Sequence, residues 1–260
     1  MTAVAARGAE ARLGSRTFYV WMAVGFIAAA FLGFAPTYWA PLAAGKLNVN
    51  PVVHVHGMVF FAWTLFFLLQ TSFVATGQVL RHRAIGMIGV SLATAMTILG
   101  PLVALNSLKI ATALGAGPRA EAFVILPLTG IVLFAALFVL AMVNIDRPEV
   151  HKRLMVLSTI AILDAPLARP FLAFVFTSLP PGPPPVWIGL PAYAVSYLFL
   201  AAAMIHDWRT RGRPHPVYWA GGGAIVAVEL LRLPVSGTAA WHGLAHAFLG
   251  LAGSMPPSAG

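Results

Sequence analysis

Seven long apolar stretches set the strongest limit on how this chain can fold. A helix needs about 20 mostly apolar residues to cross a bilayer. Runs of that length recur along the chain at 17–39, 52–76, 84–108, 120–144, 153–178, 186–206 and 217–235. Only 9% of the residues are charged, against about 25% in soluble domains. We therefore expect an all-α polytopic membrane protein whose seven transmembrane helices contact the lipid bilayer.

The stretches divide the chain into three parts. Residues 1–16 form a basic, Ala-rich leader that we expect to be retained, because the apolar run after it is long enough to span. Residues 17–235 form the seven-helix transmembrane domain. Residues 236–260 form a tail that is too short and Gly-rich for another span, and we expect a short amphipathic or re-entrant helix near 239–251.

The basic residues predict how the chain is oriented. Segments between the stretches alternate between basic and nearly uncharged, and the basic ones all fall on one side if there are seven spans. The positive-inside rule then places the N-terminus in the cytoplasm and the C-terminus outside, as in a multi-pass protein of the bacterial inner membrane. The net charge of +9 is thus a topology signal, and nucleic acid is not an expected partner. The residues on the basic side are Arg7, Arg12, Arg16, Arg81, Arg83, Arg147, Lys152, Arg153, Arg209, Arg211 and Arg213.

Several chemistries are excluded by what the sequence lacks. There is no cysteine, which rules out disulfides, thiolate metal sites, iron–sulfur clusters and catalytic thiols. No nucleotide-binding, zinc-protease or nucleophile-elbow motif occurs in its expected context, so no catalytic residue is assigned. Haem b or a transition metal remains open as a cofactor, because histidine can bind either.

Histidines are paired at the predicted outer face. His54 and His56 stand at the start of the second stretch, and His242 and His246 lie four residues apart in the tail. Residues spaced i, i+4 share a helix face, which suits one metal ion, and the four imidazoles are candidate metal ligands. His54 and His56 are also candidate cofactor ligands, although they share one direction only if the helix starts after them. The alternative is that all four are interfacial histidines.

One polar stripe runs down the second stretch. His56, Trp63 and Gln70 recur every seven residues, and such a stripe usually faces protein. Four more histidines lie near the predicted inner face, beside basic residues, and are either interfacial or ligands of a haem or metal. They are His82, His151, His206 and His215.

Four charged residues fall inside the spans. Asp164 and Arg169 lie in the fifth stretch, and Glu229 and Arg232 lie in the seventh. A charge at the membrane centre costs about 2.5–3.5 kcal/mol on insertion scales, so these groups should pair, with Arg169 bonded to Asp164 or Glu229. Together with Gln70 they form a candidate polar cluster, which is either a structural ion-pair network or a site that holds a ligand or relays protons.

The pattern HVHG…Q…HRAIG…HKRLM…GRPHPVYWAGG…LRLPVSGTAAW resembles a group of uncharacterised bacterial seven-helix inner-membrane proteins. The resemblance covers most of the chain and implies no established activity. The HKRLM piece also resembles a histidine-bearing motif of small four-helix proteins associated with haem–copper oxidase assembly. That resemblance implies that His151 is a haem or metal ligand.

Three functions remain open from the sequence. The first is a haem- or metal-binding membrane protein that acts in electron transfer or in maturation of a respiratory complex. The second is a small-molecule or proton-coupled transporter built on the intramembrane charges. The third is a structural subunit that packs against partners in a larger membrane complex.

Overall fold

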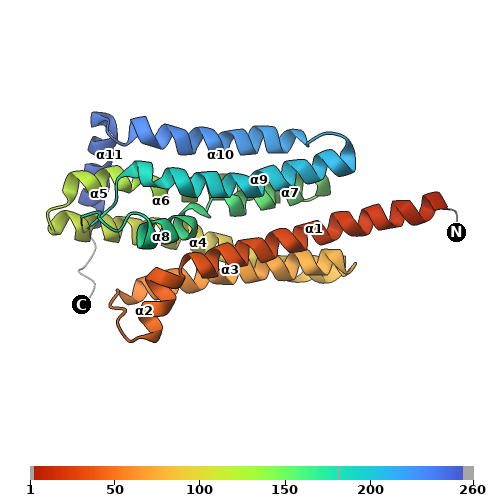
Figure 1. Cartoon of the computed structure of the whole chain (residues 1–260), viewed down its shortest axis with the longest axis horizontal. Helices are drawn as coiled ribbons and strands as arrows, with labels where there is room; N and C mark the ends of the chain where they lie inside the picture. Colours follow the sequence, from red (N-terminus) through yellow and green to blue (C-terminus); the bar gives the residue numbers. More distant parts are fainter. Residues whose placement is uncertain (1–2, 181, 254–260) are drawn as a thin grey trace.

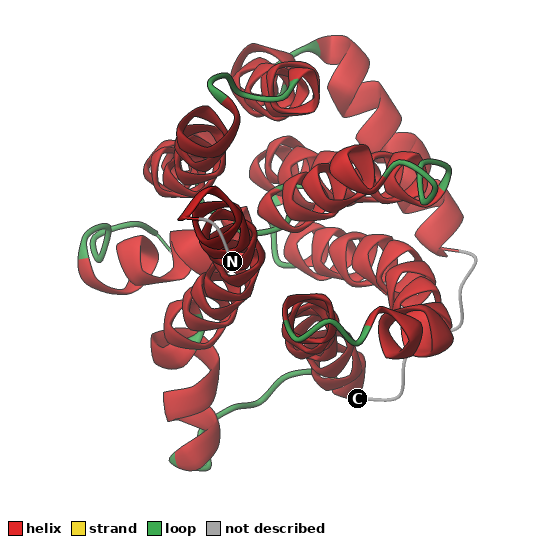
Figure 2. Cartoon of the chain, turned by 90° about the vertical axis from the view of Figure 1, so that its right-hand side faces the viewer, coloured by secondary structure: helices red, strands yellow, loops and turns green. Residues whose placement is uncertain are grey.

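The computed structural model describes the backbone of residues 3–180 and 182–253 and the side chains of residues 17–180 and 182–250. This part of the chain contains helices and no strands. Seen close to end-on, the helices form one bundle with the connections at its ends (Figure 2). In order the elements are α1 (Ala3–Gly33), the π-helix η1 (Ala35–Trp39), α2 (Ala40–Ala43), α3 (Pro51–Ala75), α4 (Val79–Ala113), α5 (Gly117–Phe123), α6 (Ile125–Met142), α7 (Pro148–Ile160), α8 (Asp164–Phe174), the 3-10 helix η2 (Val186–Ile188), α9 (Gly189–Arg211), α10 (Pro216–Val235) and α11 (Ala239–Gly253).

Six helical segments of the described chain are long and apolar enough to cross a membrane. They are Thr17–Ala43, Pro51–Ala75, Val79–Ala113, Gly117–Met142, Pro148–Phe174 and Val186–Arg211. They run along one direction of the molecule (Figure 1) and confirm the first six predicted stretches. The protein is therefore an all-helical integral membrane protein with several spans. The predicted orientation of its termini stays a prediction.

The seventh stretch differs from the other six. α10 is long and apolar enough to cross a membrane only when it is counted together with α11. The two helices are bent by 93° at the break between them. The short helix expected in the tail is present as α11, which packs against α4 and α5. The described residues thus provide six spans, or seven if the bent pair counts as one.

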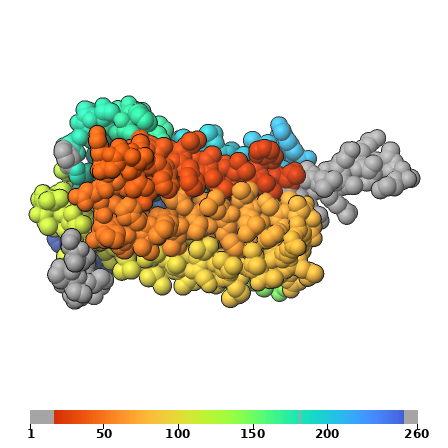
Figure 3. Space-filling model, turned by 90° about the horizontal axis from the view of Figure 1, so that it is seen from below, coloured from red at the N-terminus to blue at the C-terminus, as the bar shows by residue number. Residues whose placement is uncertain are grey.

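Aromatic side chains fill the centre of the bundle. Trp63 on α3 is 1% exposed, and its indole Nε1 donates to Thr159 Oγ1 on α7 at 3.2 Å. Its ring packs edge-on against Phe134 and Phe138 of α6. α1, α3 and α4 cover the face that Figure 3 shows, and α8 lies beside α1 at one end. The core thus ties α3, α6 and α7 together.

The fifth span is broken in the middle. Ile162 and Leu163 donate to carbonyls three residues back instead of four, and α8 then starts at Asp164. Pro166 has no N–H to offer to the carbonyl of Ile162. Pro166 also lies directly against Gly33 of α1, where a Cβ on the glycine would come within 2.3 Å of the Pro166 carbonyl oxygen. The break places a carboxylate at a helix start inside the bundle, close to α9 and α10.

Candidate functional site

A buried ion pair joins the broken helix to α10. Arg232 is 1% exposed, and its Nη1 donates to Asp164 Oδ2 at 2.6 Å and to the Tyr193 hydroxyl at 3.1 Å. Its Nε donates to Thr129 Oγ1 on α6 at 2.8 Å. Gly130 lies against the guanidinium, where an added Cβ would be 3.4 Å from Arg232 Nη2. Four helices therefore converge on one arginine.

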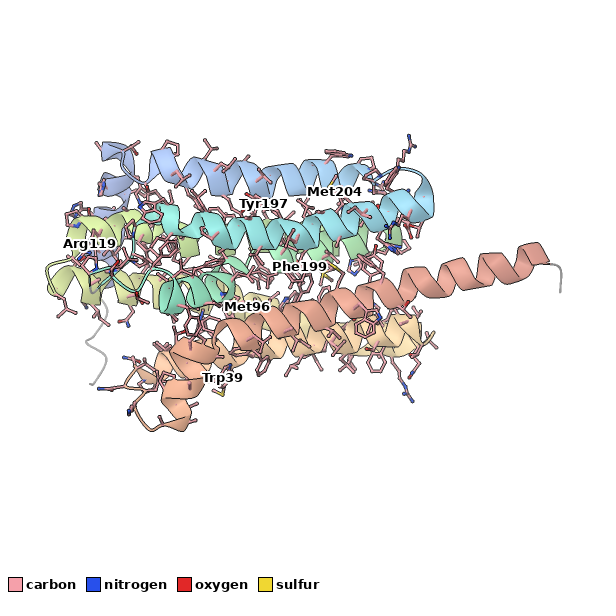
Figure 4. The ribbon with its side chains drawn as sticks, viewed as in Figure 1. Trp39, Met96, Arg119, Tyr197, Phe199 and Met204 are labelled. Carbon is pink, nitrogen blue, oxygen red and sulfur yellow. The ribbon has the colours of Figure 1, made fainter. Side chains whose placement is uncertain are left out.

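A second carboxyl group lies in the same place. Glu229 is one helical turn before Arg232, so the two share a face of α10, as the sequence predicted. Its side chain is fully buried beside Asp164 and the hydroxyl of Tyr197, and Tyr197 lies on the side of α9 that faces α10 (Figure 4). We call Thr129, Asp164, Tyr193, Tyr197, Glu229 and Arg232 the central cluster.

The central cluster is incompletely hydrogen-bonded. Five of its buried polar atoms have no partner of normal geometry among the described residues: Asp164 Oδ1, both carboxyl oxygens of Glu229, Arg232 Nη2 and the Tyr197 hydroxyl. Buried polar groups are nearly always satisfied, and exceptions often mark catalytic sites or the places of water and ions. The cluster holds two carboxyl groups and one guanidinium, so it carries a net charge of −1 when all three are ionised.

Arg169 is not part of the central cluster, contrary to expectation. Asp164 pairs with Arg232, and the Arg169 guanidinium lies 5.4 Å from the centre of the Phe34 ring. The reason is helical geometry. Arg169 follows Asp164 by five residues on α8, so the two side chains point about 140° apart around the helix axis. Arg169 therefore faces α1 and α3 rather than α9 and α10.

Gln70 is also separate from the central cluster. Its amide is buried without a partner, and the backbone of Gln70 lies beside the imidazole of His82. The rings of His82 and His151 are 6.4 Å apart between their centres. His151 Nδ1 lies 2.9 Å from the carbonyl oxygen of Ala141, and Nδ1 of His82 is buried without a partner. α3, α4 and α7 thus bring three predicted site residues together.

The other two histidines at this end do not join His82 and His151. The His206 ring stacks on Phe18 at 3.9 Å, and the His215 Nδ1 accepts from the backbone of Val217 as the N-cap of α10. Burial, together with the positive charge of Arg153, lowers the pKa of His215 below its usual range. The four predicted inner-face histidines therefore form one pair and two isolated groups.

His54 and His56 diverge because α3 starts before them. The Asn50 side chain caps the helix by accepting from the Val52 backbone at 3.0 Å, so both histidines are helical. The Tyr38 hydroxyl lies 2.6 Å from His54 Nδ1, whereas the His56 ring packs 4.2 Å from the ring of Phe60. His56 faces protein, as the stripe through Trp63 predicted, and the two imidazoles have no common ligand position.

The tail histidines bind a carboxylate that the sequence analysis overlooked. Glu121 on α5 is 5% exposed and contacts His242 Nδ1 at 2.6 Å and His246 Nε2 at 3.1 Å. Trp241 donates to the Glu121 carbonyl at 2.7 Å. These contacts hold α11 against α5, beside a surface cavity of about 400 Å³ that His242 helps to line. The pair expected from the spacing is real, but it lies apart from His54 and His56.

No metal cluster emerges from these histidines. Among the described residues, no group of three or more His, Cys, Asp or Glu is arranged to hold a metal ion. The four imidazoles predicted as one metal site split between Tyr38, Phe60 and Glu121. The structure thus separates the predicted site residues into the central cluster, a His82–His151 pair near Gln70, a His242–His246 pair on Glu121, and separate residues. The separate residues are His54, His56, Arg169, His206 and His215.

A second ion-pair network lies at the basic end of the bundle. Arg153 is 1% exposed and binds both carboxylate oxygens of Asp207, with Nε to Oδ2 at 2.8 Å. Its Nη1 also binds Glu149 at 2.7 Å, and the His215 backbone N–H donates to Asp207 at 2.9 Å. The sequence predicts Arg153 as a loop charge on the basic side. Its place in α7, four residues after Glu149, was the available signal.

Sequence reasoning also missed the hydroxyl groups of the central cluster. Thr129 occurs in an apolar helix, where threonine commonly bonds its own backbone, as it also does to Ile125 here. Tyr193 and Tyr197 resemble the aromatic residues of an apolar core. Their spacing carried no signal, because their role depends on α6 and α9 lying beside α10.

Comparisons of this chain with protein-family models, with curated proteins and with solved structures give no match.

Proposed function

We propose that this multi-pass membrane protein is a proton-coupled transporter of small molecules in the bacterial inner membrane. Its coupling site is formed by Asp164, Glu229 and Arg232. The observation that carries the proposal is a charge imbalance in a largely buried place, where two carboxyl groups lie near one guanidinium that bonds only Asp164. An unpaired buried charge is costly in free energy. Uptake of one proton brings the net charge of the cluster to zero.

The surroundings of the cluster support proton exchange rather than a purely structural role. A structural network is stabilising only when its remaining hydrogen bonds are satisfied, whereas five polar atoms of this cluster lack partners. The cluster also adjoins the break between α7 and α8. Discontinuous helices beside a polar site near the membrane centre are a recurring feature of secondary transporters.

Infrared spectroscopy of the protein in lipid tests this proposal directly. A pH-difference spectrum should show the C=O stretch of a carboxyl group that gains a proton on acidification, and Glu229→Gln should lose that band. Asp146→Asn is the matched control, because Asp146 is an exposed carboxylate in the loop before α7. Identical spectra for the wild type and Glu229→Gln would contradict the proposal.

A second candidate function is favoured by the His82–His151 pair. We propose as an alternative that these imidazoles bind a haem or a transition metal in electron transfer or in maturation of a respiratory complex. The Nδ1 of His151 bonds the Ala141 carbonyl, which leaves Nε2 as the free lone pair, an arrangement common among metal ligands.

An absorption spectrum with metal analysis decides this alternative. Protein purified in mild detergent should show a haem band or stoichiometric copper, iron or zinc. His82→Ala and His151→Ala should lose it, and His206→Ala should keep it, because His206 stacks on Phe18 elsewhere. Wild-type protein with neither signal would rule the alternative out.

A further inference from the structure

Arg169 is a cation within the fifth span that makes no ion pair with the central cluster. It lies on α8, about 7.5 Å along the helix from Asp164 at 1.5 Å per residue, and its side chain is exposed. Among the described residues no carboxylate pairs with it. A positive charge within a span is unfavourable without a counter-ion, so this position favours an anion.

The neighbours of Arg169 are suited to an organic anion. Its guanidinium lies over the Phe34 ring at 5.4 Å and within electrostatic range of His56 on α3. The Nδ1 of His56 is buried without a partner, and its ring packs against Phe60. A planar guanidinium binds an oxyanion with two parallel hydrogen bonds, and the aromatic rings provide apolar contact for the rest of the molecule.

The charges of the two places add up in an informative way. Asp164, Glu229, Arg232 and Arg169 sum to zero when all four are ionised. Uptake of one proton by the central cluster gives +1, and binding of one monovalent anion at Arg169 gives −1. Only the empty protein and the protein that holds both are neutral. Burying a net charge at low dielectric costs free energy. The two neutral forms can therefore change conformation most readily, so that the site opens to the other side of the membrane.

We infer that Arg169, with His56 beside it, binds a monovalent organic oxyanion that is carried together with one proton taken up by the central cluster. The inference rests on the proposed transport function and names its substrate class. The proton comes from water and binds a carboxylate oxygen, and the anion enters unchanged, so no bond in the substrate is made or broken.

Calorimetry with benzenesulfonate as the probe tests this inference. Benzenesulfonate is an aromatic oxyanion that stays ionised at every pH used, so any proton uptake belongs to the protein. Titration of the detergent-purified full chain in two buffers of different ionisation enthalpy gives the affinity and the protons taken up. We expect saturable binding and, by linkage, about one proton per anion.

Four variants separate the contributions. Arg169→Gln should weaken binding at least about tenfold, because a charged hydrogen-bond pair is lost, and Arg169→Lys should fall between it and the wild type, since the charge remains without the fork. Arg213→Gln removes the same charge from an exposed loop position and should bind like the wild type. Glu229→Gln should bind the anion without proton uptake.

Each remaining outcome overturns the inference. No binding to the wild type, or equal binding to Arg169→Gln, would remove the anion site, and binding without proton uptake would remove the coupling. An Arg169-dependent stabilisation in phosphatidylglycerol nanodiscs over phosphatidylcholine nanodiscs, with no benzenesulfonate binding, would assign the site to a lipid headgroup instead. The infrared experiment on Glu229 uses no anion, so a failure of the proposed transport function is detected separately.

Discussion

Two arginines of this protein are equally buried and differ in how completely they are paired. Arg153, at the basic end, binds both oxygens of Asp207 and also reaches Glu149. Arg232, in the middle of the bundle, binds one oxygen of Asp164 and leaves Nη2 without a partner. The fully bonded network ties α7 to α9, whereas the incomplete one is where we propose that a proton binds.

The largest expected effect on stability comes from breaking the fully bonded network of Arg153, Asp207 and Glu149. Asp207→Ala would leave the buried guanidinium of Arg153 without its bidentate partner, and breaking a buried pair in this way costs about 3–5 kcal/mol. The free energy of unfolding, measured by SDS titration in mixed micelles, should fall by this amount. Asp146→Ala removes an exposed carboxylate and is the control. A loss below about 1 kcal/mol would mean that this network is not structural.

Within the central cluster, two tyrosines allow a matched test. The Tyr193 hydroxyl accepts a hydrogen bond from Arg232 at 3.1 Å, while the Tyr197 hydroxyl is buried without a partner. Tyr193→Phe should therefore cost about 1.5–3 kcal/mol, the range for hydrogen bonds to charged groups. Tyr197→Phe should change stability by less than about 0.5 kcal/mol. The same unfolding assay serves for both, and equal losses would show that the hydroxyls are bonded alike.

Glu229→Gln sharpens the contrast with Asp207. The carboxyl group of Glu229 is fully buried and makes no hydrogen bond of normal geometry, so its neutral analogue removes a costly charge. We expect stability within about 1 kcal/mol of the wild type, together with loss of proton-coupled function. Destabilisation as large as that of Asp207→Ala would place Glu229 in a structural network after all.

Much of the fold could be predicted from the lengths of the apolar runs in the sequence alone. The six confirmed spans follow from runs of apolar residues, and helical phase correctly placed Glu229 and Arg232 on one buried face. Phase also predicted that the stripe from His56 through Trp63 to Gln70 faces protein. These predictions succeed because they concern one continuous helix at a time.

The site was harder to predict because it depends on which helices are neighbours. Arg169 and Asp164 lie on different faces of α8. The sequence does not indicate which neighbouring helix each face contacts. The early start of α3 at Pro51 separates His54 from His56, since a capping Asn50 replaces the extended segment that a shared site requires. Glu121 shows the same limit, because its histidine partners lie 121 and 125 residues later.

The smallest expected effect is a loss of stability at acidic pH that comes from His215, at the basic end of the bundle. His215 caps α10 beside Arg153 and Arg211, whose charges act with burial to lower its pKa, while Asp207 and Glu149 oppose them. The folded protein therefore binds this proton less readily than the unfolded chain. As pH falls below about 6.5, the ordinary pKa of histidine, the unfolded state gains protons first and stability decreases.

His215→Asn tests this dependence while keeping the cap, because asparagine is a good N-cap residue. Thermal unfolding in detergent between neutral and mildly acidic pH should show a smaller loss of stability for this variant than for the wild type. The Asp207→Ala variant sharpens the comparison, since it removes the carboxylate nearest the histidine backbone and should leave His215 harder still to protonate. An acid dependence that His215→Asn leaves unchanged would assign the sensitivity to a different group.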